Sequence, residues 1–428
     1  MIRNHFAAVV GELRDNRCAW IPEAQAWYFH DVGRQLWRPD SGLAERAATE
    51  YALKTFPDKL PGRFAREALA YAKTDDTIQR PLADFDAASG LIGTTLGPIK
   101  LDSDDPLDPA VPWPVTKTLG GCPNPGWAGS AWGEFLMSAV PDGDSRLWLQ
   151  LWAGSCLKGV SNDRCLLFIY GPGGTGKSLF VEVLMHAFGD YACILPAEIL
   201  MGRPGADAPY WKATLRGKRL AVINETAEGD YWNSPAAKSL SGGDTIHARN
   251  PYGLPFAFQP QFKIVVVSNE PPNLGRVDSA IRDRLVVFPF AQRPTTPDTG
   301  LKARLLSEAD FVLGWALEGF YALRDRFEDR LTAAAPQMIA DATSAYLADV
   351  DLVGEWLEEQ TETDWQAEYP PHMIYASYVR FVEQMGRRPK SWNNLRNDLV
   401  EREAIRCRKS NGKRLVVGLR IPGEWNDA

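Results

Sequence analysis

The chain has 428 residues, 45% of them apolar and 24% charged, and these fractions are typical of globular proteins with two or three domains. Its longest apolar runs, such as residues 166–170, fall far short of the roughly 20 residues that span a bilayer. The first residues also lack the apolar stretch of a secretory signal, so we expect a cytoplasmic protein without a membrane segment. A net charge of −7 argues against a surface that coats DNA all over, because phosphate affinity requires clustered Lys and Arg.

The six cysteines are scattered, with no CxxC pair and no clustered histidine beside them. Zinc sites and disulfide frameworks need closely spaced ligands or paired cysteines, so the spacing indicates neither. We expect free thiols at Cys18, Cys122, Cys156, Cys165, Cys193 and Cys407.

The first 130 residues predict a small α+β domain. Aromatic and polar residues alternate around Gly33, which favours a short hairpin, and the Ala- and Glu-rich residues 42–77 favour helices. Residues 102–129 are rich in Pro, Gly and Asp and predict an irregular connection. We therefore place the first domain at residues 1–130.

Residues 131–335 predict an α/β domain. Short β-branched runs alternate with helical segments here, which is the pattern of a mainly parallel sheet flanked by helices. Near its end, Ser307 is predicted to cap a helix that carries Phe311, Trp315 and Phe320 at roughly helical spacing. Residues 336–428 are expected to form a third unit.

A glycine-rich loop follows the apolar run CLLFIY and leads into the helical pattern SLFVEVLMHAF, which stops at Gly189. The loop satisfies G-x-x-x-x-G-K-[ST] in the strand and helix context that this phosphate-binding motif requires. Its glycines let backbone N–H groups wrap phosphates, Lys177 neutralises the β- and γ-phosphates, and Ser178 ligates Mg²⁺. We predict an ATP and Mg²⁺ site at Gly171, Pro172, Gly173, Gly174, Thr175, Gly176, Lys177 and Ser178.

Two later apolar runs end in polar residues. Residues 219–223 deliver Asn224 and Glu225 to the carboxyl end of a predicted strand, where ligands of α/β nucleotide sites bind. Glu225 is placed to polarise the attacking water, and Glu228 in the following loop is the weaker candidate. The run QFKIVVVSN ends at Asn269, whose amide suits a sensor of the γ-phosphate, although asparagine also favours turns.

Arg282 and Arg284 precede the apolar run LVVFPF. They stand too far along the chain to belong to the phosphate loop, so we interpret one of them, Arg284 by preference, as an arginine finger acting on a neighbouring subunit. Such a finger stabilises charge in the transition state and requires an assembly. A surface ion pair with Asp278 or Asp283 is the alternative, and their proximity in sequence does not separate the two.

With these four motifs in order, residues 132–290 resemble the ATPase core of the superfamily 3 helicases of phages and plasmids, which has an AAA+ type fold. The segment KSLSGGDTIHARNPYGLPFAFQPQFK resembles the family's extra motif, a β-hairpin that reaches into a central DNA channel. The resemblance places the hairpin tip at residues 249–254, and a plain turn is compatible with that role. It makes Arg249, Asn250 and Tyr252 candidate DNA contacts, with Lys238 and His247 as further candidates.

The ends of the chain carry weaker resemblances. Residues 18–130 look like the family's N-terminal helicase-associated domain, and residues 374–421 look like its C-terminal winged-helix-type module. Residues 373–420 hold 12 Lys or Arg against 4 Asp or Glu, a balance of +8. Such clustering favours contact with the DNA backbone. The candidates are Arg387, Arg388, Lys390, Arg408, Lys409 and Arg414.

The resemblance implies a homo-hexameric ring that hydrolyses ATP and moves 3′ to 5′ on single-stranded or forked DNA in a bacterial host cell. A primase or an origin-binding protein would be its candidate partner. Many relatives carry an acid where this chain has Asn224, so Ser178 is expected to make the direct Mg²⁺ bond, with Asn224 as a further ligand. The chain leaves no room for the primase domain of larger relatives, so we expect no primer synthesis.

Two other classes of function remain open at this stage. One is an origin-binding or regulatory ATPase that uses ATP as an assembly switch, and the basic C-terminal segment favours it. The other is a small-molecule phosphotransferase, in which the hairpin motif would lack a purpose. Stimulation of ATP hydrolysis by DNA would separate the phosphotransferase from both DNA-dependent functions.

Overall fold

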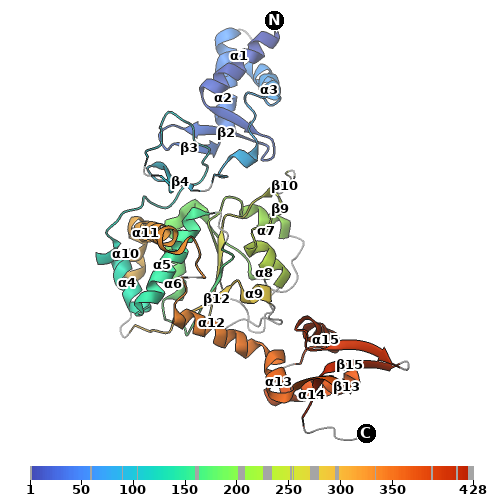
Figure 1. Cartoon of the computed structure of the whole chain (residues 1–428). Helices are drawn as coiled ribbons and strands as arrows, with labels where there is room; N and C mark the ends of the chain where they lie inside the picture. Colours follow the sequence, from blue (N-terminus) through green and yellow to red (C-terminus); the bar gives the residue numbers. More distant parts are fainter. Residues whose placement is uncertain are drawn as a thin grey trace. The chain divides into compact units, whose positions relative to one another are not determined.

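The computed structural model describes most of the chain, namely residues 2–57, 60–88, 90–103, 105–159, 163–200, 208–224, 234–250, 253, 255–269, 279–294, 298–332, 334–386, 389–410 and 413–422. The chain divides into two compact units. Figure 1 shows the chain coloured by residue number. The N-terminal unit comprises Met1–Pro272 and Asp283–Ala340, and the C-terminal unit comprises Asn273–Arg282 and Asp341–Ala428. Across these ranges, no helix is both long and apolar enough to cross a bilayer.

The N-terminal unit begins with helices packed beside a small antiparallel sheet of order β1-β2-β3. The hairpin predicted around Gly33 is present as the β2–β3 pair, and two helices occupy the predicted helical stretch. Residues 105–126 have no helix or strand, as their composition predicted. The elements are α1 (Ile2–Asp15), β1 (Cys18–Ile21), β2 (Ala26–Asp31), β3 (Leu36–Pro39), α2 (Ser41–Thr55), α3 (Pro61–Ala72), β4 (Leu91–Thr94) and β5 (Gly97–Lys100).

A five-stranded parallel sheet of order β12-β6-β11-β8-β7 follows, which confirms the predicted α/β fold class. Its strands are β6 (Leu166–Tyr170), β7 (Ala192–Ile194), β8 (Leu220–Asn224), β11 (Lys263–Ser268) and β12 (Leu285–Pro289). The surrounding elements are α4 (Ala131–Ala139), α5 (Gly143–Lys158), α6 (Lys177–Phe188), α7 (Ala208–Thr214), α8 (Ser234–Ser241), β9 (Ile246–Arg249), β10 (Pro255–Phe258), α10 (Leu301–Ser307) and α11 (Ala309–Phe327). Short 3₁₀ helices cover Leu82–Asp84, Trp127–Gly129, Gly189–Tyr191 and Ala197–Ile199.

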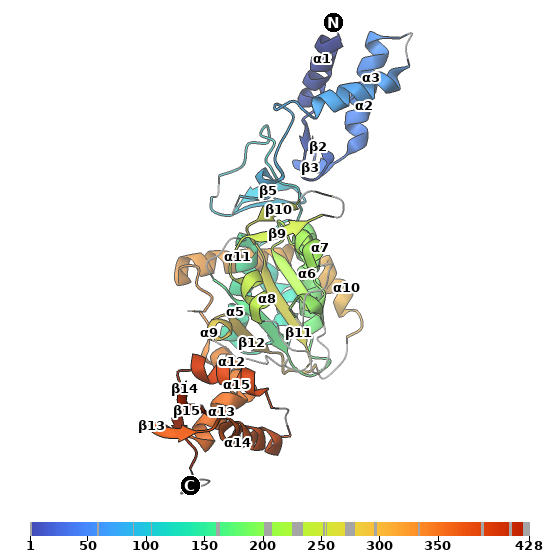
Figure 2. The ribbon, with the colours of Figure 1, turned by 90° about the vertical axis from the view of Figure 1, so that its right-hand side faces the viewer.

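Helices cover both faces of this sheet, with α5, α6 and α11 on one side and α7 and α8 on the other (Figures 1 and 2). Strands β6, β11 and β12 are therefore almost continuously apolar and buried, which is why the sequence showed short β-branched runs rather than alternation. Helix α6 stops at Gly189, a residue with a left-handed φ of 52°, at the position where the sequence predicted its end.

The main core lies between the sheet and α4, α5, α6 and α11. Four tryptophans are fully buried in it, and the indole of Trp132 stacks on Phe180 and meets Trp315 edge to face. The Trp148 indole N–H donates to the Leu331 carbonyl at 3.0 Å, which satisfies its polar atom inside the core. The four are Trp132, Trp148, Trp152 and Trp315.

The predicted helix cap at Ser307 is wrong. Ser307 is the last residue of α10, and its hydroxyl donates back to the Arg304 carbonyl instead of accepting from the next helix. The cap residue of α11 is Glu308, and its carboxylate accepts from the backbone N–H groups of Ala131 and Trp132 at the start of α4. The helix itself is present as predicted, with Trp315 and Phe320 in the core.

The C-terminal unit is a three-stranded antiparallel sheet of order β13-β15-β14 with helices packed on it. After α12 (Gln337–Val350), which runs across the boundary between the units, the order is helix, strand, helix, helix, strand, strand. These are α13 (Leu352–Gln360), β13 (Glu362–Tyr369), α14 (Pro371–Gln384), α15 (Trp392–Glu401), β14 (Arg406–Ser410) and β15 (Lys413–Arg420), and α9 (Ser279–Arg282) also belongs to this unit. The fully buried Trp356 and Tyr378 anchor its separate core.

Candidate nucleotide site

The strand register brings several predicted site residues to one edge of the sheet. Tyr170 at the end of β6 pairs with Ser268 at the end of β11, and Asn224 at the end of β8 pairs with Val267. Asn224 and Asn269 are both exposed at this edge. In the sheet, β11 lies between β6 and β8. Asn269 therefore follows the strand beside β6, which leads into the phosphate loop, whereas Asn224 ends a strand two positions from β6, about 10 Å away.

The phosphate loop has the backbone that its glycines predict. Gly171, Gly174 and Gly176 have φ values of 145°, 81° and 92°, all in the region that side chains avoid. A Cβ on Gly171 would also lie 2.1 Å from the carbonyl oxygen of Phe290. The Thr175 hydroxyl closes the loop by donating to the Pro172 carbonyl at 3.0 Å. Its backbone is therefore held in a tight turn at the N-terminus of α6.

Lys177 is held within this turn and is only 4% exposed. Its ammonium group donates to the carbonyl oxygens of Gly171 at 2.6 Å and Pro172 at 2.8 Å. Burial lowers the pKa of Lys177, and the positive charge of Arg293 lowers it further. An anion bound at the loop would act in the opposite direction and raise the pKa of Lys177, because a nearby negative charge favours the charged ammonium. Ser178, next along α6, is exposed and able to face a metal ion.

Arg293 was not among the residues predicted from the sequence. It follows β12 at the same edge of the sheet, after Phe290, whose N–H donates to the Tyr170 carbonyl at 2.8 Å. No local motif marks this arginine, since its proximity to Lys177 depends on the pairing of β12 with β6.

Some predicted residues lie outside the described part of the chain. These are Glu225, Glu228, Tyr252, Asp278, Arg387 and Arg388.

Arg284 lies at the amino-terminal ends of the strands, whereas the phosphate loop lies at their carboxyl ends. Its carbonyl accepts from the N–H of Leu166, the first residue of β6, at 2.8 Å. The five residues of β6 separate this edge from the loop by about 15 Å. Arg284 is also 8% exposed. Its backbone thus lies at the far end of β6 from the phosphate loop of its own chain.

A β-hairpin occupies the predicted position between β8 and β11. Arg249 and Pro255 form its last pair before the tip. Arg249 is exposed, and its Nε donates to the Gly253 carbonyl at 3.0 Å, while Asn250 is half-buried. His247 is exposed on the same face of the ribbon, and the half-buried Lys238 lies on α8.

Part of the basic excess of the C-terminal unit is neutralised by carboxylates. Asp398, which is buried, accepts from Lys390 at 2.7 Å and from Arg402 at 2.8 Å. Asp351, also buried, accepts from Arg402 at 2.6 Å and from Arg282 at 2.7 Å. Arg282 thus has an ion-pair partner in Asp351, a residue that the sequence did not suggest.

On the surface of this unit, Arg408 pairs with Glu368, and Arg414 is exposed on β15. The backbone of Lys409 in β14 pairs with that of Arg414. The balance of +8 over residues 373–420 therefore overstates the charge available to DNA, because Arg402 and Arg408 pair with Asp351 and Glu368, two carboxylates outside that range.

Comparison with known proteins places the chain near viral helicases. Residues 169–284, from β6 to Arg284, match a family described as "Family of unknown function (DUF5906)". The chain is 26% identical over 358 residues to "Putative helicase 022R" of Frog virus 3 (isolate Goorha), covering 76% of this chain and 34% of that one. It is 30% identical over 161 residues to "Putative helicase L207/L206" of Acanthamoeba polyphaga mimivirus, covering 37% and 17%. The chain thus spans about a third or less of the length of these relatives.

The solved structures include one that is similar along nearly the whole chain. It is described as the A form apo structure of NrS-1 C terminal region-CTR, with a TM-score of 0.53 and 12% identity, and the match covers 97% of this chain and 98% of that one. At this identity the likeness concerns the fold alone. The fold and the matched relatives define a P-loop α/β protein similar to proteins named as helicases in large DNA viruses.

Proposed function

We propose that this protein is an ATP-driven DNA helicase of the superfamily 3 type, which acts as a ring of six copies on single-stranded DNA during replication of a virus, phage or plasmid. The observation that carries the proposal is the sheet edge that gathers the phosphate loop, Asn224 and Asn269, with a hairpin inserted between β8 and β11. The similarity to viral proteins named as helicases supports it independently.

The residues divide the chemistry among them. Lys177 and the backbone N–H groups of the loop hold the phosphates of ATP. Ser178 and Asn224 would hold Mg²⁺, which would neutralise the negative charge that develops on the phosphates during hydrolysis. The exposed Ser178 and Asn224 suit that ion, because Mg²⁺ prefers oxygen ligands. Glu225 orients the attacking water, and Asn269 senses the γ-phosphate.

Arg284 completes the site from a neighbouring copy and stabilises charge in the transition state. Its place at the far edge of the sheet supports action between copies rather than within one chain. The hairpins, through Arg249 and Tyr252, would then move with each round of hydrolysis and carry the strand 3′ to 5′.

The test is ATP hydrolysis with and without single-stranded DNA, together with strand separation on forked DNA. Lys177→Ala is expected to remove nucleotide binding, while Glu225→Gln keeps binding and stops turnover. Lys302→Ala is the matched control, because Lys302 is an exposed lysine outside the phosphate loop that pairs with Glu182. Normal turnover in Glu225→Gln would refute the assignment of the general base.

Mixing experiments test the shared site. Arg284→Ala is expected to abolish hydrolysis without weakening nucleotide binding, and mixing it with Lys177→Ala protein restores part of the activity. Arg330→Ala, a change at an exposed arginine, is the control and is expected to be neutral. A mixture that stays inactive at every ratio contradicts a site shared between copies.

A regulatory ATPase that binds DNA without unwinding it is the second candidate. The order of elements in the C-terminal unit, helix, strand, helix, helix, strand, strand, supports a winged-helix-type DNA-binding module and so favours this function too. It predicts DNA-stimulated assembly and hydrolysis with no strand separation. A forked substrate that is unwound in proportion to ATP consumed decides for the helicase.

A further inference from the structure

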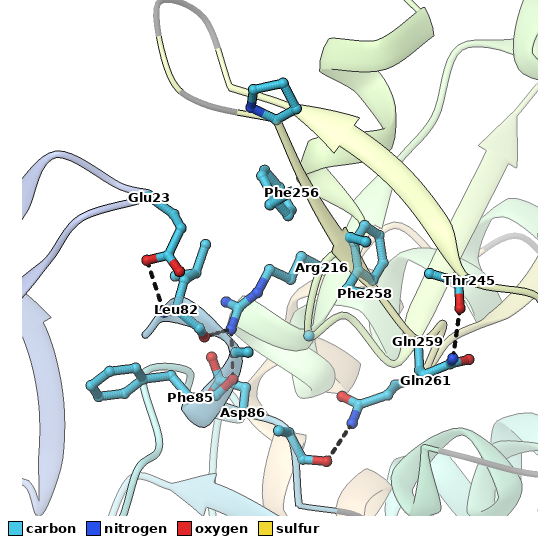
Figure 3. A pocket seen from close by; sticks show the side chains of 15 residues that line it. Glu23, Leu82, Phe85, Asp86, Arg216, Thr245, Phe256, Phe258, Gln259 and Gln261 are labelled. Atoms are coloured by element: carbon cyan, nitrogen blue, oxygen red, sulfur yellow. Dashed lines mark hydrogen bonds between the residues drawn. The ribbon is translucent and has the colours of Figure 1, made fainter. Parts of the chain in front are cut away.

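A cavity of about 580 Å³ lies within the N-terminal unit, between the first domain and the β9–β10 ribbon (Figure 3). The first domain contributes Glu23, Leu82 and Phe85, and β10 contributes Phe256 and Phe258. Arg216, from the turn before β8, forms a third side. The volume falls in the range of about 300–1,000 Å³ that small-molecule sites occupy in proteins.

The ribbon presents two aromatic rings to this cavity. Phe256 and Phe258 alternate along β10, so both lie on one face of the ribbon, with ring centroids 6.0 Å apart. Each remains half-buried, whereas the core aromatics of the ATPase domain are fully covered. Figure 3 shows both rings and the Arg216 guanidinium around the same space. Phe256 also packs against an apolar cluster of the first domain that includes Leu82 and Phe85, so the two rings border the cavity with part of their apolar surface.

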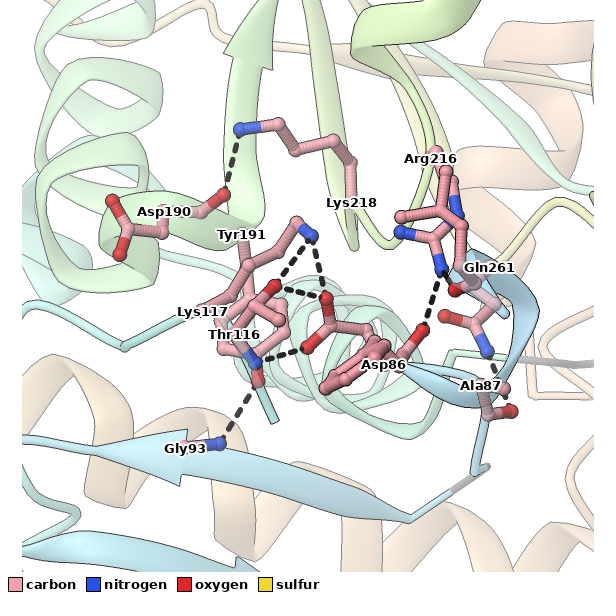
Figure 4. A network of polar contacts seen from close by, with 12 residues as sticks. Asp86, Ala87, Gly93, Thr116, Lys117, Asp190, Tyr191, Arg216, Lys218 and Gln261 are labelled. Carbon is pink, nitrogen blue, oxygen red and sulfur yellow. Dashed lines mark hydrogen bonds and ion pairs between the residues drawn. The ribbon is translucent and has the colours of Figure 1, made fainter. Parts of the chain in front are cut away.

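The opposite wall is fixed by buried polar contacts (Figure 4). Arg216 donates through Nη2 to the carbonyl oxygens of Leu82 and Phe85. Beside it, the buried Asp86 accepts from Lys117 at 2.8 Å and from the Thr116 N–H at 2.8 Å. Burial alone would raise the pKa of Asp86, but Lys117 and the Thr116 bonds more than offset this and lower it. This wall is consequently charged yet internally satisfied.

The charges around the cavity balance. The charged residues that line the cavity are Glu23, Asp86 and Arg216. Asp86 is neutralised by Lys117, which does not line the cavity, and this leaves one carboxylate and one guanidinium. A phosphate would meet no excess of positive charge there. Gln261, 6% exposed, donates to the Ala87 carbonyl at 3.0 Å, while its Oε1 has no hydrogen-bond partner in the described structure. A neutral planar ring with polar edges fits these surroundings better than an anion or a plain hydrocarbon.

We propose that this cavity binds a single nucleobase, which stacks on Phe256 and Phe258. The inference rests on the proposed function, because a base presented by single-stranded DNA would lie at the root of the hairpin that moves the strand. Arg249 and His247 lie on the opposite face of the ribbon and do not line the cavity. Base–aromatic stacking is tolerant of sequence, so the site would hold the strand without reading it.

The experiment measures quenching of 2-aminopurine, a fluorescent base, with the full chain. One arm uses the base within a single-stranded oligonucleotide, and the other uses the free deoxyribonucleoside, which separates a DNA base from a free nucleoside. Phe256→Leu, Phe258→Leu and the double variant keep apolar bulk and remove the rings. Phe64→Leu is the control, because Phe64 is a partly buried aromatic of the first domain that does not line the cavity.

Wild type and Phe64→Leu are expected to quench the base, and the double variant is expected to bind the oligonucleotide at least about fivefold more weakly. Unchanged thermal unfolding confirms that each variant folds; if the double variant does not, Phe258→Leu alone carries the test. Equal binding and quenching in wild type and the ring variants overturns the inference.

The two proposals fail separately. If DNA stimulates hydrolysis and the ring variants behave as wild type, the helicase function stands and the base site is overturned. If hydrolysis ignores DNA while the free nucleoside is quenched only when the two rings are present, the base site stands and the translocase function is overturned.

Discussion

Helices α5 and α11 cross with two glycines in direct contact, and this crossing supports a specific prediction for Gly319→Ala. A Cβ on Gly319 would lie 2.0 Å from the carbonyl oxygen of Gln150 and 2.5 Å from its carbon. Reciprocally, a Cβ on Gly154 would lie 2.1 Å from the N of Phe320. The obstructing atoms are backbone, so no side chain can rotate away to make room.

Two opposing effects decide the result. Alanine in place of glycine within a helix stabilises by about 1 kcal/mol, since it reduces the freedom of the unfolded chain and favours helix. A Cβ atom in ordinary contact lies at least 3.4 Å from its neighbour, whereas the added Cβ would lie 2.0 Å from the Gln150 oxygen. The two helices must therefore separate by about 1.4 Å. Overpacking of this kind costs about 1–3 kcal/mol, and backbone contact places it at the upper end. We expect Gly319→Ala to destabilise by about 2 kcal/mol net.

Gly11→Ala is the matched control, because Gly11 lies in α1 and a Cβ added there would have no atom within 4 Å. It is expected to stabilise by up to about 1 kcal/mol. Scanning calorimetry should show the unfolding midpoint of the N-terminal unit fall by about 4 °C in Gly319→Ala and rise slightly in Gly11→Ala. An equal or higher midpoint for Gly319→Ala would refute the close crossing of α5 and α11.

Two further predictions concern buried ion pairs. Lys117 lowers the pKa of Asp86 in the folded protein, against the effect of burial. The ionised Asp86 therefore stabilises the fold at pH values above its pKa in the unfolded chain, and this stabilisation is lost as the pH falls through its pKa in the folded protein. The difference in urea unfolding between wild type and Asp86→Asn should therefore be large at pH 7 and shrink below about pH 4; a constant difference would contradict the pairing. Asp351→Asn leaves Arg402 without one of its buried carboxylates and should destabilise the C-terminal unit by about 3 kcal/mol, measured by hydrogen exchange. Glu368→Gln removes the surface partner of Arg408 and should change the stability of the C-terminal unit by less than about 1 kcal/mol. Similar effects of Asp351→Asn and Glu368→Gln would argue against the buried network.

The sequence predicted features that depend on neighbouring residues. The phosphate loop, the helix that ends at Gly189 and the hairpin at Gly33 follow from backbone freedom and apolar periodicity, which act over a few residues. The same local reasoning failed at Ser307, because a serine that can cap the next helix can equally bond back to its own. Which of these it does depends on where α10 ends, and Glu308 instead bonds to the start of α4.

Only the tertiary structure decided which distant residues meet. In the sequence, Asn224 and Asn269 follow the phosphate loop in that order. Their distances from the loop depend on the position of β11 between β6 and β8, which only the folded sheet shows. The ion pairs of Arg282 and Arg402 with Asp351 join residues 69 and 51 positions apart, and no local pattern marks them. The cavity at Phe256 likewise forms where the first domain meets the ribbon. Such contacts arise from packing of whole elements, whereas sequence patterns report mainly the conformation and burial of each element separately.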